Sequence, residues 1–122
     1  MKLNFSIIVP VYNRPNEIDA LLESLTKQHF SDDFEVLIIE DGSEIAAENI
    51  VKKYHSQLNV HYFFKENSGA GSSRNYGMQR ATGNYFIILD SDVLLPKTYL
   101  AEVQKGLVYR FTHAFGGRKA AH

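Results

Sequence analysis

The sequence predicts an α/β protein with three α/β/α layers, in which a mainly parallel sheet lies between helices. Two observations lead to this fold class. Short β-branched apolar runs alternate along the chain with segments whose apolar residues recur at helical spacing. The strand-like runs are apolar almost throughout, as expected of strands that are buried on both faces. Strands that alternate with helices in this way form parallel sheets with right-handed crossovers.

The first half of the chain contains two predicted strand–helix units. The strands are residues 5–11 (FSIIVPV) and 34–40 (FEVLIIE). After each strand, apolar residues recur at positions that share one face of a helix. Asn16 is the predicted N-cap of the first helix. The two apolar faces comprise Ile18, Leu21, Leu22 and Leu25, and then Ala47, Ile50, Val51 and Tyr54.

The second half repeats the pattern. Residues 59–65 (NVHYFFK) and 85–89 (YFIIL) are predicted strands, and residues 71–82 between them are a predicted helix. Gly83 suits a left-handed cap at the end of that helix. The last helix is predicted to start after Pro96, which is typical of a first helical turn. Its apolar positions are Leu100, Val103 and Leu107.

Composition limits the functional classes. The 122 residues are 44% apolar and 22% charged, which fits one folded domain with a modest core. The net charge of −1 offers no basic face for nucleic acid. The chain has no cysteine, which excludes disulfides and thiolate metal sites. Pro10 and Asn13 interrupt the first apolar run, which we interpret as a strand and not a signal peptide, and no window approaches a membrane span.

Residues 1–122 are therefore predicted to form a single domain. Its last part, from about residue 109 to 122, matches no helix or strand pattern and is predicted to be an irregular tail. No closing strand follows the fourth strand–helix unit, so the domain is expected to be truncated.

Chemically active residues follow all four predicted strands. In open parallel sheets, ligands bind beyond the carboxyl ends of the strands. Tyr12 follows the first strand, Asp41 the second and Arg74 the third, while Asp90 and Asp92 follow the fourth. The expected edge thus combines acids, an arginine, an aromatic ring and a glycine-rich helix start. That combination suits a nucleotide with a metal ion.

Each side chain has a matching group on such a ligand. Tyr12 offers a flat face to a base, and Asp41 can accept a hydrogen bond from a base or ribose. Arg74 can pair with phosphate in fork geometry. Asp90 and Asp92 can point to one side, because alternate strand residues share a face. Their hard oxygens suit Mg²⁺ or Mn²⁺, ions that bridge carboxylates to phosphate.

Each signal also has an ordinary structural explanation when it stands alone. An Asp-x-Asp pair is often a turn or cap, and Asp41 could simply begin a turn before a helix. Arg74 could be a solvated helix residue, and Tyr12 could pack on the sheet edge. The five scattered histidines are not interpreted as ligands. The coincidence of several signals at one edge favours the functional interpretation.

Three stretches together resemble family 2 glycosyltransferases. They are SIIVPVYNR, IIEDGS and NSGAGSSRNYGMQRATGNYFIILDSDV. The resemblance runs from about Lys2 to about Val108 and covers the nucleotide-binding half of that family. It implies the GT-A fold and an inverting enzyme. Such an enzyme transfers a sugar from a nucleotide-sugar donor, commonly a UDP-sugar, to an acceptor hydroxyl.

The resemblance also implies roles for residues on the nucleoside side. Pro10, Val11 and Tyr12 would line the nucleoside pocket. Asp41 would hydrogen-bond the base, commonly uracil. Arg74 would contact the nucleotide and its diphosphate side.

The motif Asp90-Ser91-Asp92 resembles the DxD motif of the family. The resemblance implies that Asp90 lies towards the ribose and the metal, and that Asp92 is the direct metal ligand. A Mg²⁺ or Mn²⁺ ion there would neutralise the diphosphate leaving group.

No catalytic base is assigned. An inverting transferase needs a carboxylate base, which in this family lies downstream of the DxD motif in the acceptor-binding half. Glu102 falls on a helix pattern, and Arg118 and Lys119 stand where some members have an acidic residue after a glycine pair. The chain is therefore expected to be a donor-binding half.

Two other functions stay open at this point. The chain could be a non-catalytic module that binds UDP or a UDP-sugar. A phosphohydrolase of the haloacid dehalogenase type is disfavoured, because its aspartates lie on an early strand. For a transferase we expect a glycan, lipid-linked or protein acceptor, a homodimer, and a cytoplasmic location that includes the inner membrane face.

Overall fold

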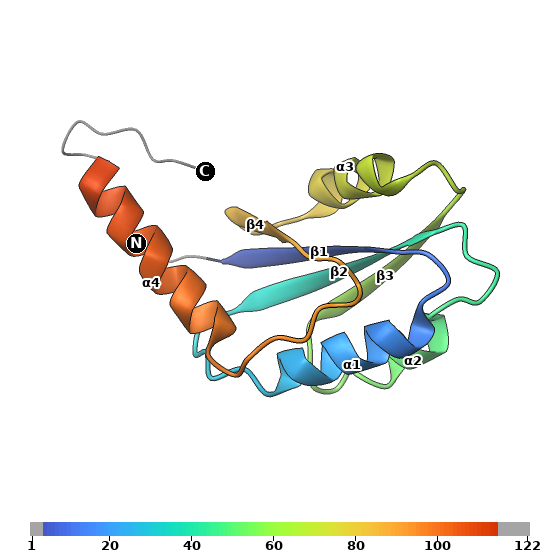
Figure 1. Ribbon diagram of the computed structural model, residues 1–122, viewed down its shortest axis with the longest axis horizontal. Helices are drawn as coiled ribbons and strands as arrows, with labels where there is room; N and C mark the ends of the chain where they lie inside the picture. The colour runs from blue at the N-terminus through green and yellow to red at the C-terminus, as the bar shows by residue number, and fades with distance from the viewer. Residues whose placement is uncertain (1–3, 115–122) are drawn as a thin grey trace.

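The structure is a parallel sheet with helices on both faces (Figure 1). It is a computed structural model, which describes the backbone of residues 4–114 and the side chains of residues 4–107. The elements in chain order are β1 (Phe5–Val11), α1 (Pro15–Thr26), β2 (Phe34–Asp41), α2 (Glu48–Lys52), β3 (Val60–Lys65), α3 (Ala70–Arg80), β4 (Tyr85–Ile88) and α4 (Tyr99–Ala114).

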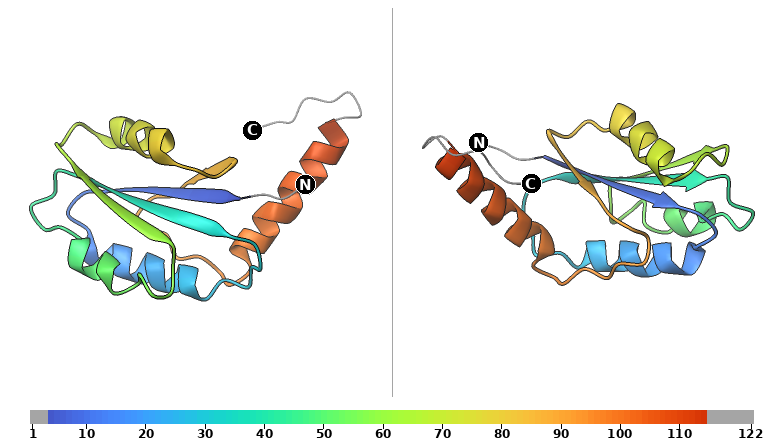
Figure 2. Two further views of the ribbon diagram at one scale, coloured as in Figure 1. Left: turned by 180° about the vertical axis from the view of Figure 1, so that it is seen from behind. Right: turned by 45° about the horizontal axis from the view of Figure 1, so that its top comes forward.

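The layers agree with the prediction. Helices α1 and α2 cover one face of the sheet and α3 covers the other, while α4 extends beyond the end at which the strands begin (Figures 1 and 2). The strand order is β3-β2-β1-β4, and every pairing is parallel. The predicted α/β class and parallel sheet are confirmed.

The larger part of the core lies between the sheet and α1. Alternate residues of β1, including Phe5 and Ile7, pack there with the apolar face of α1. Ile8, Leu37 and Ile39 point to the opposite face and form a smaller cluster on the α3 side. The two central strands are apolar nearly throughout because helices cover both of their faces.

Two predicted helix caps are wrong. Helix α1 begins at Pro15, and its N-cap residue is Arg14, which makes no side-chain capping bond. Asn16 lies inside the first turn, because proline is pre-set for the first helical position and starts the helix earlier. Helix α3 ends in an extended Ala81.

Gly83 is a glycine for a reason other than capping. It does not have a positive φ. A Cβ atom there would lie 2.6 Å from both the Asn4 carbonyl oxygen and the Ser6 Oγ. The chain before β4 therefore passes against the start of β1 more closely than any side chain permits.

The predicted irregular tail is wrong for residues 109–114, where α4 continues to Ala114. No proline or glycine interrupts the sequence between Gly106 and Gly116, so nothing local stops the helix. Residues 115–122, with Arg118 and Lys119, lie outside the described residues. Within the described range, no helix has the length and apolarity to cross a membrane.

Candidate functional site

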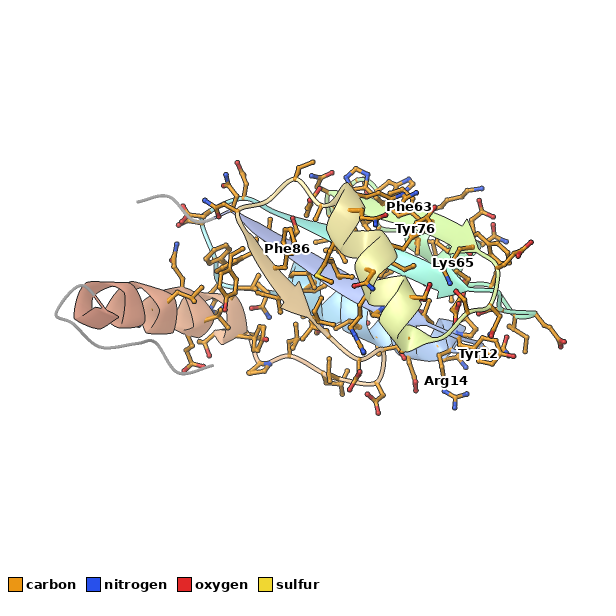
Figure 3. All side chains as sticks on the ribbon, turned by 90° about the horizontal axis from the view of Figure 1, so that it is seen from above. Tyr12, Arg14, Phe63, Lys65, Tyr76 and Phe86 are labelled. Carbon is orange, nitrogen blue, oxygen red and sulfur yellow. The ribbon has the colours of Figure 1, made fainter. Side chains whose placement is uncertain are left out.

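The four strands end at a common edge, as the sequence predicted. Because the sheet is parallel, the loops that follow Val11, Asp41, Lys65 and Ile88 all leave it in the same direction. Seen from above, Tyr12 and Lys65 lie around the amino-terminal end of α3 (Figure 3). We call this the carboxyl edge of the sheet.

The predicted residues of the first strand differ in what they offer. Tyr12 is 50% exposed directly after β1, so its ring is accessible at the carboxyl edge. Pro10 is partly exposed within the strand. Val11 is buried in the core, and only its backbone can line a pocket here.

Asp41 is the last residue of β2, and its side chain is buried within a hydrogen-bonded cluster. Its Oδ1 accepts from the Lys65 Nζ at 2.7 Å and from the Ser68 N–H at 2.9 Å. Its Oδ2 accepts from the Gly69 N–H at 3.0 Å. Burial raises the pKa of Asp41, but these donors and the Lys65 charge outweigh burial and hold the pKa below its usual value.

The same aspartate fixes the loop that leads into α3. The Asn67 Nδ2 donates to the Asp41 carbonyl at 3.0 Å, in addition to the bonds from Ser68 and Gly69. Gly42, with φ of +67°, leaves room for this loop, since a Cβ there would lie 2.6 Å from the Asn67 nitrogen. Asp41 therefore sets where α3 begins relative to β2.

Lys65 was missed by the sequence analysis. It ends β3 directly beside Asp41 in the strand register, and its side chain is 11% exposed. The signal that could have found it is positional: a lysine and an aspartate that end neighbouring parallel strands lie side by side.

Glu40 was also not predicted as a site residue. It connects the loop after β1 with the loop after β2. Its fully buried carboxylate accepts from the Ala47 N–H at 2.7 Å, from the Tyr62 hydroxyl at 2.9 Å and from the Ser43 hydroxyl. The Ser43 Oγ in turn accepts from the Asn13 N–H at 2.8 Å. Burial, together with Glu40, raises the pKa of Tyr62. This network fixes the loop after β1 against the loop after β2.

Asp90 and Asp92 lie exposed in the turn after β4. The Ser91 hydroxyl between them donates to the Glu17 carboxylate at 3.4 Å, which links this turn to the first turn of α1. Among residues 4–107 there is no cluster of three or more side chains that could hold a metal. Two exposed carboxylates nevertheless fit Mg²⁺ or Mn²⁺, which commonly take their remaining oxygens from phosphate and water.

Arg74 is exposed on α3, one turn from its start. Its Nη2 lies 3.8 Å from the position that a Cβ on Gly71 would take. The guanidinium therefore lies along the first turn of the helix. The structure thus brings Tyr12, Asp41 and Arg74 to one edge, with the Asp90–Asp92 turn at the same edge.

Comparisons with known proteins agree with this arrangement. The family model described as "Glycosyl transferase family 2" matches residues 6–121. The chain is 37% identical over 103 residues to poly(ribitol-phosphate) beta-N-acetylglucosaminyltransferase TarS of Staphylococcus aureus, and this match covers 82% of the chain and 18% of TarS. The chain therefore spans less than a fifth of that relative.

Two solved structures are similar in fold. The crystal structure of S. aureus TarS 1-349 in complex with UDP-GlcNAc has a TM-score of 0.82 at 36% identity, covering 91% of this chain and 32% of that one. The mannosyltransferase PcManGT of Pyrobaculum calidifontis, in complex with GDP-Man and Mn²⁺, has a TM-score of 0.81 at 26% identity, covering 88% and 33%.

Proposed function

The chain belongs to glycosyl transferase family 2, and on this premise we propose that it forms the donor site of an enzyme that transfers a sugar from a UDP-sugar to an acceptor hydroxyl. The observation that carries the proposal is the shared carboxyl edge, where the exposed Tyr12 ring and the buried Asp41 carboxylate lie at the start of α3, the helix that carries Arg74. A UDP-GlcNAc complex of a relative with 36% identity supports the choice of donor.

Each residue at the edge has a proposed part in donor binding. The Tyr12 ring stacks on the base, and Pro10 and the Val11 backbone line the pocket beside it. Asp41 accepts a hydrogen bond from the base. Arg74 neutralises part of the diphosphate charge, because a guanidinium pairs with phosphate oxygens in fork geometry.

Asp92, with Asp90, is the proposed metal site for Mg²⁺ or Mn²⁺. When bound there, such an ion supplies positive charge against the diphosphate as it leaves. Both carboxylates are exposed and their oxygens are hard ligands, so the donor set fits either ion. The Mn²⁺ in the PcManGT complex supports metal use within the family.

Transfer by attack of the acceptor hydroxyl would invert the sugar, and it requires a general base. We assign this role to no residue of the chain. A second candidate function is therefore donor binding without transfer, because no residue of the chain is assigned as the base. The same proposal includes a role in polysaccharide biosynthesis, with a glycan or lipid-linked acceptor. It also includes a homodimer and a cytoplasmic location, in part at the inner membrane face.

Isothermal titration of UDP into the purified chain tests the donor site. We expect binding in Mn²⁺ that is lost in EDTA and weakened at least tenfold by Asp92→Asn, a change that keeps the side-chain shape and removes the charge. Glu102→Gln is the matched control, because Glu102 is exposed on α4 away from the carboxyl edge. Equal UDP affinity in Mn²⁺ and EDTA would contradict the metal site.

A further inference from the structure

The ammonium group of Lys65 is fully committed to neighbours on the carboxyl edge. An ammonium has three N–H donors and no acceptor. In Lys65 they reach the Asp41 Oδ1 at 2.7 Å, the Glu66 carbonyl at 2.8 Å and the Ser68 Oγ at 2.5 Å. The side chain is 11% exposed. Lys65 therefore has no spare donor for a ligand and influences the site through Asp41.

The Asp41 carboxylate has few acceptor positions left for a ligand. A carboxylate has about four lone-pair positions, two on each oxygen. Lys65 and the Ser68 N–H use both positions of Oδ1, and the Gly69 N–H uses one position of Oδ2. Within the described part of the chain, no other donor reaches this carboxylate. One acceptor position therefore remains, on Oδ2.

The single acceptor position left on Asp41 distinguishes nucleotide bases by the number of hydrogen-bond donors they present. Uracil has one ring N–H between two carbonyls, and that single donor matches one acceptor position. Guanine places a ring N–H beside an exocyclic amino group, and the two parallel donors match both oxygens of a free carboxylate. With Oδ1 already saturated, one guanine donor would face the Asp41 side chain, which is only 9% exposed, without an acceptor. An unpaired donor beside so buried a carboxylate is costly.

We propose that Lys65 is a specificity-determining residue that makes the site choose a base with a single donor, such as uracil, over guanine. The proposal rests on the proposed donor site and adds the residue that sets its base selectivity. Lys65 acts as a positioning residue, because it saturates one oxygen of Asp41 and touches no part of the nucleotide itself.

Three nucleotides test this on the unmodified chain, by calorimetry in Mn²⁺: UDP, inosine diphosphate and GDP. Inosine keeps the ring N–H of guanine and lacks its amino group, so the two purines differ only in the second donor. We expect inosine diphosphate to bind about tenfold more tightly than GDP. The proposal would be overturned if GDP bound as tightly as inosine diphosphate. It would also be overturned if UDP bound and neither purine nucleotide did, because the size of the base would then determine the selectivity.

A variant tests the role of Lys65 directly. Lys65→Met keeps the apolar stem and reopens one position on Oδ1, so the preference for inosine diphosphate over GDP should fall by about tenfold. Lys105→Met makes the same change on exposed α4 and should leave the preference unaltered. An unchanged preference, or loss of all nucleotide binding, in a folded Lys65→Met chain contradicts the proposal.

Two further outcomes are distinguishable. If Lys65→Met does not give a cooperative melt, the ranking of the three nucleotides on the unmodified chain decides alone. If the unmodified chain binds none of them, the donor site itself fails, and not only the assignment of Lys65.

Discussion

Asp41 shows how one residue can have both a structural role and a proposed binding role. Its carboxylate receives three hydrogen bonds, two of which fix the start of α3, and it retains one acceptor position for a ligand. The two roles are not independent. Any change to Asp41 alters the position of α3 and the pocket together, so a loss of binding in an Asp41 variant would not show direct contact with the base.

Glu40 offers a cleaner test at the scale of one residue, because its role is structural. Its carboxylate accepts from Ala47, Tyr62 and Ser43 and donates nothing. In Glu40→Gln, an amide N–H₂ replaces one oxygen and faces a donor, so at least one buried donor loses its partner. We expect the free energy of unfolding in urea to fall by about 1–3 kcal/mol.

The control for this measurement is Glu48→Gln, the same change at an exposed position in the first turn of α2. It should alter stability by less than about 0.5 kcal/mol. Equal losses in the two variants would mean that the Glu40 network does not stabilise the loops.

At the scale of elements, two helical glycines differ in their surroundings. Gly77 in α3 faces the sheet, and a Cβ there would lie 2.5 Å from the Ile8 Cγ2 and 3.3 Å from the Ile39 Cγ1. Gly106 in α4 has nothing within 4 Å of that position. The absence of a side chain at Gly77 lets α3 pack closely against β1 and β2, and this packing offsets the low helix propensity of glycine.

This difference predicts opposite effects of one substitution. Gly106→Ala should stabilise the chain by up to about 1 kcal/mol, because alanine is the better helix former. Gly77→Ala should instead destabilise it by about 1–3 kcal/mol, because overpacking against a rigid strand outweighs propensity. Urea unfolding measures the free energy of unfolding of both variants. Stabilisation by Gly77→Ala would show that α3 can shift without cost.

The elements differ in how well the sequence predicted them. Residues 5–11 were predicted exactly as β1, since a continuous β-branched run between helical patterns has few other interpretations. Helix ends were less predictable. The cap of α1 depended on Pro15, and the end of α3 depended on contacts between Gly83 and the start of β1, which lies far away in the sequence.

The site shows the same division. Tyr12, Asp41, Arg74 and the Asp90–Asp92 turn could be placed at the carboxyl edge, because the direction of parallel strands alone puts them there. The bond from Lys65 to Asp41 was not predicted, because the positional signal for it applies only once β2 and β3 are known to be neighbours in this register. Patterns within single segments hold no information about register.

At the scale of the whole molecule, β2 has a buried carboxylate near each end. Asp41 lies at the carboxyl edge, and Glu35 lies at the opposite end of the strand. The Glu35 Oε2 accepts from the Ser6 hydroxyl and the Thr82 N–H, both at 2.6 Å. Burial raises the pKa of Glu35, but these bonds and nearby His61 outweigh it and lower the pKa below the usual 4.5.

Both lowered pKa values make the fold sensitive to acid. A carboxyl whose pKa is lower in the folded chain stabilises that chain above its unfolded pKa, and this contribution disappears as the pH falls through the folded pKa. The usual values are 4.5 for Glu35 and 3.8 for Asp41. The free energy of unfolding in urea should therefore be steady near neutral pH and decline once the pH drops below these values.

Glu35→Gln tests how much of this decline belongs to one end of the sheet. Both donors reach the single oxygen Oε2, so an amide oxygen placed there can still accept from both. Because the amide has no charge, the two bonds are weaker, and the variant should be less stable at pH 7 by about 1–2 kcal/mol. The difference from the unmodified chain should shrink as the pH falls below 4.5, because Glu35 takes up a proton first in the unfolded chain and then, at lower pH, in the folded chain. A difference that stays constant down to pH 3 would instead mean that Glu35 stabilises the fold through packing, and that the acid sensitivity arises at the carboxyl edge.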